Sequence, residues 1–155
     1  MAIKDKEEPW QRHIAKSITF IVTKDCQLAC KYCYLVGKNS KERMSWEVAK
    51  AAIDYILDHE EEMIEESVIW DFIGGEPFLE IDLIDKICDY LKVEMFRRHH
   101  HWFNSYRFSF STNGINYGSE KVQRANSTSK CKITKCFCKS TPLVLRNSIS
   151  FLVSH

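Results

Sequence analysis

Residues 67–77, SVIWDFIGGEP, indicate the fold of this chain more clearly than any other stretch of its sequence. The first seven of these residues are mostly apolar and rich in β-branched and aromatic side chains, which is typical of a buried strand. The run stops abruptly at Gly74-Gly75-Glu76-Pro77, a tetrapeptide of turn-forming residues. The sequence therefore predicts a buried strand with this tetrapeptide at its C-terminal end.

Strand and helix patterns alternate on both sides of this segment. Upstream, the β-branched run at 17–23 (SITFIVT) predicts a strand, and apolar residues at helical spacing predict a helix at 46–60 with Ser45 as its N-cap. Downstream, the same spacing predicts a helix at 80–98, and the alternating YRFSFS at 106–111 predicts a third strand. The order is β-α-β-α-β, so we expect an α/β fold with parallel strands and right-handed crossovers. A third helix could open within 115–124.

Each predicted strand is followed at once by a conspicuous motif. A cysteine cluster follows the first strand, Gly-Gly-Glu-Pro follows the second, and Ser-Thr-Asn-Gly at 111–114 follows the third. In parallel sheets and barrels, ligands bind at the C-terminal ends of the strands. We therefore expect the three motifs to form one site.

The cysteine cluster consists of Cys26, Cys30 and Cys33, spaced as C-x3-C-x2-C. Zinc sites usually need four ligands in separate pairs, whereas an iron–sulfur cube held by three thiolates keeps one iron open for a substrate or cofactor. Three ordinary reduced cysteines, or part of a zinc knuckle, are the alternatives. The strand directly before the cluster and the aromatic Tyr32 within it favour a 4Fe–4S cluster, whose iron suits soft thiolate donors.

The segment CQLACKYCY at 26–34 resembles the signature of the radical S-adenosylmethionine (radical SAM) enzymes. The tetrapeptide at 74–77 is similar to that family's second motif, and Thr-Asn-Gly at 112–114 is similar to one common after its third strand. The resemblance covers about 15–124 and is strongest to the SPASM-type peptide and protein maturases. It implies the N-terminal half of a radical SAM partial (β/α)6 barrel.

By this resemblance, the three cysteines ligate the cluster and S-adenosylmethionine (SAM) binds to it. Reductive cleavage of SAM would give a 5′-deoxyadenosyl radical that takes a hydrogen atom from a ribosomally made peptide or protein. The electron donor would be a flavodoxin or a ferredoxin. The resemblance thus implies an oxidoreductase that acts in peptide or protein maturation.

The resemblance also implies which residues contact SAM. One aromatic ring would lie beside the adenine, the glycines and the glutamate would receive the methionyl amino group, and the proline would fix the turn. Glycines let a ligand approach the backbone closely, and a carboxylate suits an ammonium group. The implied cofactor-binding residues are Tyr32, Gly74, Gly75, Glu76, Pro77, Ser111, Thr112 and Asn113.

Charge divides the chain unevenly, although its formal net charge is +1. All 21 Asp and Glu residues lie at or before Glu120, and the last 31 residues hold five Lys and Arg residues and no acid. We expect an N-terminal extension at 1–14, a truncated radical SAM core at 15–124, and an atypical tail at 125–155 that a shifted reading frame or disorder would explain. The alternative to an enzyme is therefore an inactive truncated product or a simple iron–sulfur or metal-binding module.

Composition limits the compartment and the partners. The charged N-terminus has no secretory signal, no run of about 18 apolar residues exists, and seven cysteines without a signal favour reduced thiols, so we expect the cytoplasm. A near-neutral chain is no strongly basic nucleic-acid binder. We expect neither nucleic acid nor a membrane as a partner.

Other conspicuous residues receive structural interpretations. Cys88 lies on the apolar stripe of the second helix and predicts a core thiol. The three histidines at 99–101 predict a solvated helix end, because adjacent side chains point in different directions. The cysteines of CKITKCFC at 131–138 do not resemble an auxiliary-cluster region, and we expect no metal there. Asp71, inside an apolar strand, has two interpretations: a buried polar group with hydrogen-bond partners, or a group that faces a barrel lumen.

Overall fold

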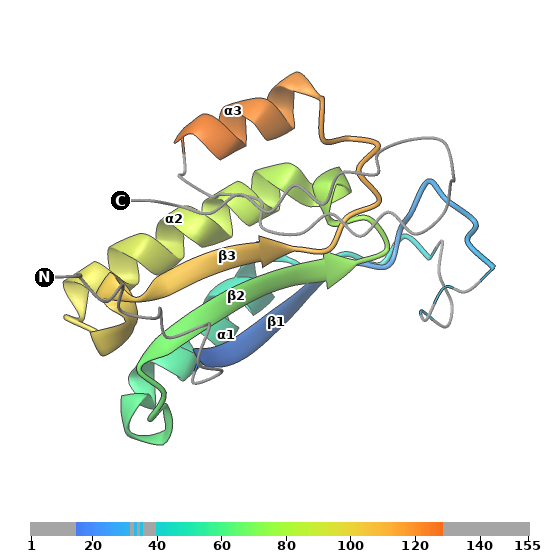
Figure 1. Ribbon diagram of the computed structural model, residues 1–155. Coiled ribbons are helices and arrows are strands. Elements are labelled where there is room, and N and C mark those ends of the chain that lie inside the picture. The colour runs from blue at the N-terminus through green and yellow to red at the C-terminus, as the bar shows by residue number, and fades with distance from the viewer. Residues whose placement is uncertain (1–14, 32, 34, 36–39, 129–155) are drawn as a thin grey trace, which may run out of the picture.

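The computed structural model describes residues 15–31, 33, 35 and 40–128, with side chains described up to residue 125 (Figure 1). The predicted β-α-β-α-β order is confirmed, and short 3-10 helices (η) lie between its elements. The third helix begins at Glu120, within the range 115–124 in which the sequence predicts its start. The elements are β1 (Ala15–Thr23), α1 (Trp46–Asp58), η1 (Glu60–Glu62), β2 (Ser67–Gly74), η2 (Pro77–Glu80), α2 (Ile81–Arg97), η3 (His101–Asn104), β3 (Tyr106–Phe110) and α3 (Glu120–Thr128).

The three strands form one open parallel sheet with β2 in the centre. The register aligns Phe20, Phe72 and Phe110 in one row across the sheet, with ring centroids 5.6 and 5.2 Å apart. The predicted α/β class with parallel strands is confirmed. Because the strands are parallel, their C-terminal ends all lie at the same edge of the sheet (Figure 1).

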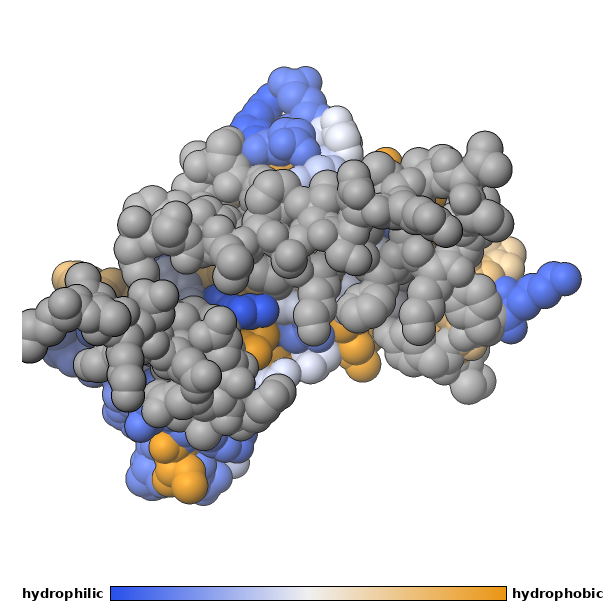
Figure 2. Space-filling model, in the orientation of Figure 1, coloured by the Kyte–Doolittle hydropathy of each residue, from blue (hydrophilic) through white to orange (hydrophobic). Residues whose placement is uncertain are grey.

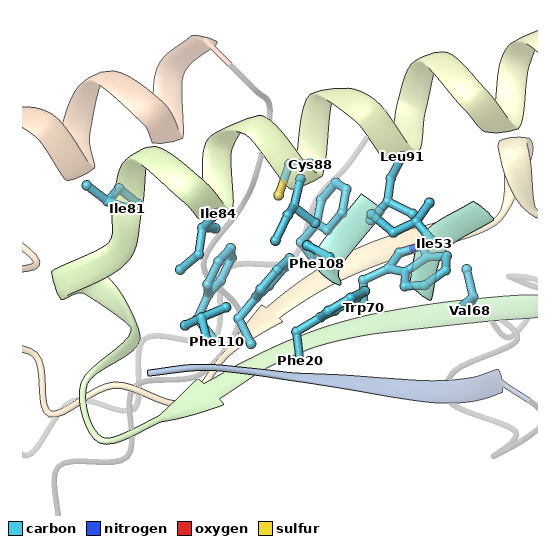
Figure 3. Packing of buried hydrophobic residues seen from close by; sticks show 14 of the residues in the cluster. Phe20, Ile53, Val68, Trp70, Ile81, Ile84, Cys88, Leu91, Phe108 and Phe110 are labelled. Atoms are coloured by element: carbon cyan, nitrogen blue, oxygen red, sulfur yellow. The ribbon is translucent and has the colours of Figure 1, made fainter. Parts of the chain in front are cut away.

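The main core lies between the sheet and the helices α1 and α2 (Figure 3). Trp70 and Trp102 are fully buried and meet edge to face, with centroids 5.9 Å apart. Cys88 is also fully buried, which confirms its prediction as a core thiol. Ser45 caps α1, because its hydroxyl accepts a hydrogen bond from Val48 N at 3.3 Å. Apolar burial on one helix face thus holds both crossovers against the sheet.

The other face of the sheet is more polar. Thr19, Asp71 and Ser109 form a row across the three strands. Asp71 lies between the buried Trp70 and Phe72, so strand alternation directs its side chain to the face away from α1 and α2. Asp71 is therefore not a buried polar group of the helix-covered core.

Charged side chains also join α1 to α2. Arg98 donates to Asp54 at 2.9 Å and to Glu94 at 3.1 Å, and the Tyr90 hydroxyl donates to Asp54 at 2.7 Å. Arg97 donates to Glu94 at 2.6 Å. Arg97 and then Arg98 hold the pKa of Glu94 below its ordinary value, although partial burial opposes them. These bonds fix the helix pair at the end where the chain turns towards β3.

The prediction of a solvated helix end at the three histidines is wrong for His100. That side chain is 2% exposed, and its Nδ1 accepts a hydrogen bond from Trp102 N at 3.2 Å, which caps η3. His99 has a φ of 52°, so the chain reverses there and places the next ring beside the buried Trp102. Burial lowers the pKa of His100 and favours its neutral form.

None of the helices in the described part of the chain is both long and apolar enough to cross a membrane.

Candidate metal centre

The cysteine loop starts where β1 ends and is closed at its base by backbone hydrogen bonds. Met44 N donates to Val22 O at 2.9 Å, and Lys24 N donates to Glu42 O at 3.0 Å. These bonds bring the returning chain back to the end of β1. The segment 24–42, which carries the three cysteines, therefore enters and leaves at the ligand-binding edge of the sheet.

The three cysteines of the loop are half-buried and form no disulfide bond. Cys33 N donates to Cys30 O at 3.2 Å, and Leu28 N donates to Cys26 Sγ at 3.4 Å. Tyr32, the predicted neighbour of the adenine, lies outside the described residues, as do the cysteines of 131–138.

Gly74 and Gly75 let this loop lie directly against the end of β2. Gly75 N donates to Thr23 O and Glu76 N donates to Asp25 O, both at 2.8 Å. A Cβ on Gly74 would lie 2.3 Å from Thr23 O, and one on Gly75 would lie 2.1 Å from Asp25 O. No side chain fits at such distances. The space that the glycines open is thus filled by the chain's own backbone, next to the first cysteine.

Glu76 joins the end of β2 to the end of β3. It is fully buried, and its Oε1 accepts hydrogen bonds from the Thr112 hydroxyl at 2.6 Å and from Phe78 N at 3.1 Å. Its Oε2 accepts from Asn113 N at 2.7 Å. A carboxylate offers about four lone-pair positions, so these bonds leave capacity for one further donor such as an ammonium group.

Asn113 contacts both of the other motifs. Its Nδ2 donates to Cys26 Sγ at 3.8 Å and to Gln27 Oε1 at 3.4 Å, while its backbone N bonds to Glu76. Its Oδ1 accepts from Ile115 N at 2.9 Å, which fixes the orientation of the amide. Hydrogen bonds therefore connect the three motifs that the sequence places at one edge.

The other two predicted residues support the backbone at this edge. Pro77 is the first residue of η2, where a missing N–H removes no helical hydrogen bond. Ser111 N donates to Phe72 O at 3.0 Å and extends the pairing of β3 past its last residue. Both residues lie beside those that carry the side-chain contacts.

Three residues of this edge were not predicted from the sequence: Asp25, Gln27 and Arg43. Arg43 pairs with Glu80 at 3.0 Å and with Asp25 at 3.8 Å, and so ties the returning loop to η2. Asp25 also acts through its backbone carbonyl, a role that any residue type could fill. The sequence feature that could have indicated these three residues is their position, next to the cysteines or at the base of the loop.

A second group of metal-binding residue types lies at the opposite end of β2. Within the described residues, Glu60, His100 and His101 place their ligand atoms within 4.8 Å of one another. The two imidazole rings stack with planes only 20° apart, however, so their in-plane lone pairs cannot meet at one ion. The nitrogens of His101 also bond to Glu60 at 2.7 Å and to Glu65 O at 3.0 Å. This group is a structural network that joins η1 to η3.

The cysteine triad suits a cluster better than a single ion. Sulfur ligands about 2.3 Å from one tetrahedral zinc lie within about 4 Å of one another. In the part of the chain that the structure describes, the three cysteine sulfurs do not gather within 4.8 Å. A cube bonds each thiolate to a different iron, so its sulfur ligands stand farther apart. The donor set, three soft thiolates on one loop, thus fits an iron–sulfur cube.

Comparison with known proteins agrees with this assignment. The model of a family described as a 4Fe–4S single cluster domain matches residues 16–135. An uncharacterised protein of Methanocaldococcus jannaschii is 43% identical over 75 residues, which are 48% of this chain and 24% of that protein. The chain therefore spans about a quarter of the length of the curated relative it matches.

Proposed function

The chain belongs to the 4Fe–4S single cluster domain family and is an iron–sulfur domain, and from that premise we propose that it acts as a radical SAM enzyme or as the cluster-binding part of one. In this proposal Cys26, Cys30 and Cys33 hold the cluster. The observation that carries the proposal is the position of Asn113, which contacts Cys26 and Glu76 at once. That contact joins the metal-binding motif to the motif that would bind the cofactor.

The residues of the chain would divide the work between holding the cluster and orienting SAM. When bound and reduced, a 4Fe–4S cluster supplies the electron that breaks the sulfonium carbon–sulfur bond of SAM. Three protein ligands leave one iron open for the methionyl group. Glu76 would accept the methionyl ammonium with its remaining lone-pair capacity, next to the backbone of Gly74 and Gly75.

The other contacts to SAM follow from the same arrangement. Tyr32 would lie against the adenine, and Ser111, Thr112 and Asn113 would line the mouth of the site. Burial at this edge would exclude water, which protects a reactive radical. The substrate would be a ribosomally made peptide or protein, and the electron donor a flavodoxin or a ferredoxin. The similarity of the cysteine motif to peptide and protein maturases supports these two assignments.

The burial of Glu76 supports a second candidate function. This carboxylate is fully buried and already accepts three hydrogen bonds from the chain. In this candidate the three bonds are the whole role of Glu76, which fastens β2 to β3. The second candidate is therefore an iron–sulfur module that binds a cluster without cleaving SAM.

Anaerobic reconstitution with iron and sulfide, followed by addition of SAM and dithionite, tests both candidates. A radical SAM enzyme gives the broad visible absorption of a cluster and then 5′-deoxyadenosine, measured by liquid chromatography. A cluster without 5′-deoxyadenosine favours the second candidate. Failure of the chain to take up iron and sulfide contradicts both.

The ligand assignment has its own test. Cys30→Ala should lose the visible absorption band, because the cube then lacks one of its three thiolates. Cys88→Ala is the matched control, since this thiol lies in the core between α2 and the sheet and should leave the band in place. A fully retained band in Cys30→Ala refutes the assignment.

A further inference from the structure

We propose that Asn113 is a positioning residue that raises the reduction potential of the cluster by donating a hydrogen bond to the Cys26 thiolate. The inference rests on the proposed cluster site and goes beyond it. It gives a function to the side chain of Asn113. Without that function, the third motif is only a turn between β3 and α3.

The orientation of the Asn113 amide is fixed from two sides. Its Oδ1 accepts from Ile115 N at 2.9 Å, and its own backbone N donates to Glu76 Oε2 at 2.7 Å. With the backbone and the carbonyl end both held, Nδ2 faces the cysteine loop and lies 3.8 Å from Cys26 Sγ. The amide therefore needs no reorganisation to donate to this sulfur.

A turn alone does not explain this arrangement. Asn and Asp both stabilise such turns by accepting a hydrogen bond from the backbone two residues ahead, which here is the bond from Ile115 N. The amide nitrogen has no part in that bond. Its contact with Cys26 thus requires asparagine, whereas the turn requires only a side-chain oxygen.

Hydrogen bonds to a cluster thiolate stabilise the reduced state more than the oxidised state, because the reduced cluster carries one more negative charge. Cys26 Sγ accepts from Leu28 N at 3.4 Å and from the Asn113 amide. The first donor belongs to the backbone and is the same for almost every side chain at that position. The second depends on one side chain, so a substitution of Asn113 can change the potential.

The contact of Asn113 with Gln27 sharpens the test. The same amide nitrogen donates to Gln27 Oε1 at 3.4 Å, so the sulfur and this exposed side chain share one NH2 group. Gln27→Ala should strengthen the bond to sulfur and shift the potential in the positive direction. Removal of Asn113 should shift it in the negative direction.

The experiment is a redox titration of the reconstituted full chain without SAM, monitored by electron paramagnetic resonance of the reduced cluster. Asn113→Ala should make one-electron reduction less favourable by about tenfold, which corresponds to about 59 mV. Asn113→Asp keeps the turn acceptor but places a carboxylate beside the thiolate, so its shift should be larger and in the same direction. Asn116→Ala, on the same loop, is the control and should titrate as the unchanged chain does.

The outcomes separate this inference from the proposed function. Unchanged potentials in the Asn113→Ala and Asn113→Asp variants, with clusters intact, overturn the role of Asn113 and leave the cluster site standing. Failure of the unchanged chain to form a cluster overturns the proposed function itself. If neither Asn113 variant assembles a cluster, the reduction potential of the Gln27→Ala variant tests the inference. A potential that does not shift in the positive direction overturns it.

Discussion

At the scale of single residues, close backbone contact decides which side chains the candidate site tolerates. The chain that leads into the cysteine loop lies so close to Gly74 and Gly75 that a Cβ on either glycine would lie within 2.3 Å of a carbonyl oxygen. This packing differs from the reason that the sequence suggested, which was the approach of a ligand to the backbone. The two glycines thus shape the site by letting the backbone at the end of β1 pack against them.

Gly75→Ala should destabilise the chain by about 1–3 kcal/mol, because its Cβ would lie 2.1 Å from Asp25 O and force the loop away from β2. Urea unfolding followed by circular dichroism measures the change. Gly118→Ala is the control, since no atom lies within 4 Å of the added methyl group. The control should be neutral or more stable by up to about 1 kcal/mol. Equal midpoints for the two variants would contradict the role of Gly75.

The sequence predicts some of these residues and not others for a physical reason. The metal-binding cysteines can be predicted from the sequence, because metal binding depends on the residue type and on its spacing. The carbonyl of Asp25 acts in the same way whatever side chain follows it, so its role cannot be read from residue type. The sequence also does not predict that His100 is buried between two exposed histidines. Its burial depends on how Trp102 packs in the folded chain.

At the scale of elements, apolar patterns locate each strand and helix, whereas the ends depend on partners. β1 begins at Ala15 rather than at 17 because Ala15 and Lys16 pair with Ser67 and Val68 of the neighbouring strand. α3 begins only at Glu120, after turns that include the bond from Tyr117 N to Gly114 O. Neither effect can be read from the segment's own periodicity.

The ion pairs of Glu94 with Arg97 and Arg98, at the C-terminal end of α2, predict an acid-sensitive stability. Glu94 has a pKa below its ordinary value in the folded chain, chiefly through Arg97. Its contribution is therefore present above the unfolded pKa of about 4.3 and is lost as the pH falls through the lower folded value. The free energy of unfolding should fall over this range in urea titrations between about pH 6 and pH 3.

Glu94→Gln should lose about 1 kcal/mol at neutral pH and show a weaker fall in acid, because the substituted amide does not titrate. Glu61→Gln, an exposed substitution on η1, should retain the full acid dependence. The interpretation fails if the Glu94→Gln chain loses stability in acid as steeply as the Glu61→Gln chain does.

At the scale of the whole molecule, the described sheet has β1 and β3 as its edges. Parallel edges offer unpaired backbone groups to other chains. Large apolar side chains are also exposed, and Figure 2 shows apolar atoms at the surface. The most exposed of them are Val48, Tyr55, Ile64, Val93, Phe96 and Ile115. An open sheet of this kind is stabilised when a further element covers its edges and its apolar surface.

The chain by itself should therefore be poorly stable. Limited proteolysis should cleave it at a rate that approaches the rate for the urea-unfolded chain, with fragments identified by mass spectrometry. A compact, resistant core that ends near residue 155 would contradict this expectation. The α/β class and the order of strands and helices along the chain follow from sequence periodicity, but stability depends on surfaces that periodicity does not describe.

The closed base of the cysteine loop separates the length of that loop from the geometry of the sheet. Bonds from Met44 to Val22 and from Lys24 to Glu42 fix both ends, so residues added well inside the loop would cost mainly closure entropy. That entropy grows slowly, by about 0.6 kcal/mol for each doubling of length. Extra residues in the part of the loop after Cys26 would therefore leave the sheet unchanged, whereas Asp25 and Cys26 stay fixed by their bonds to Glu76 and Asn113.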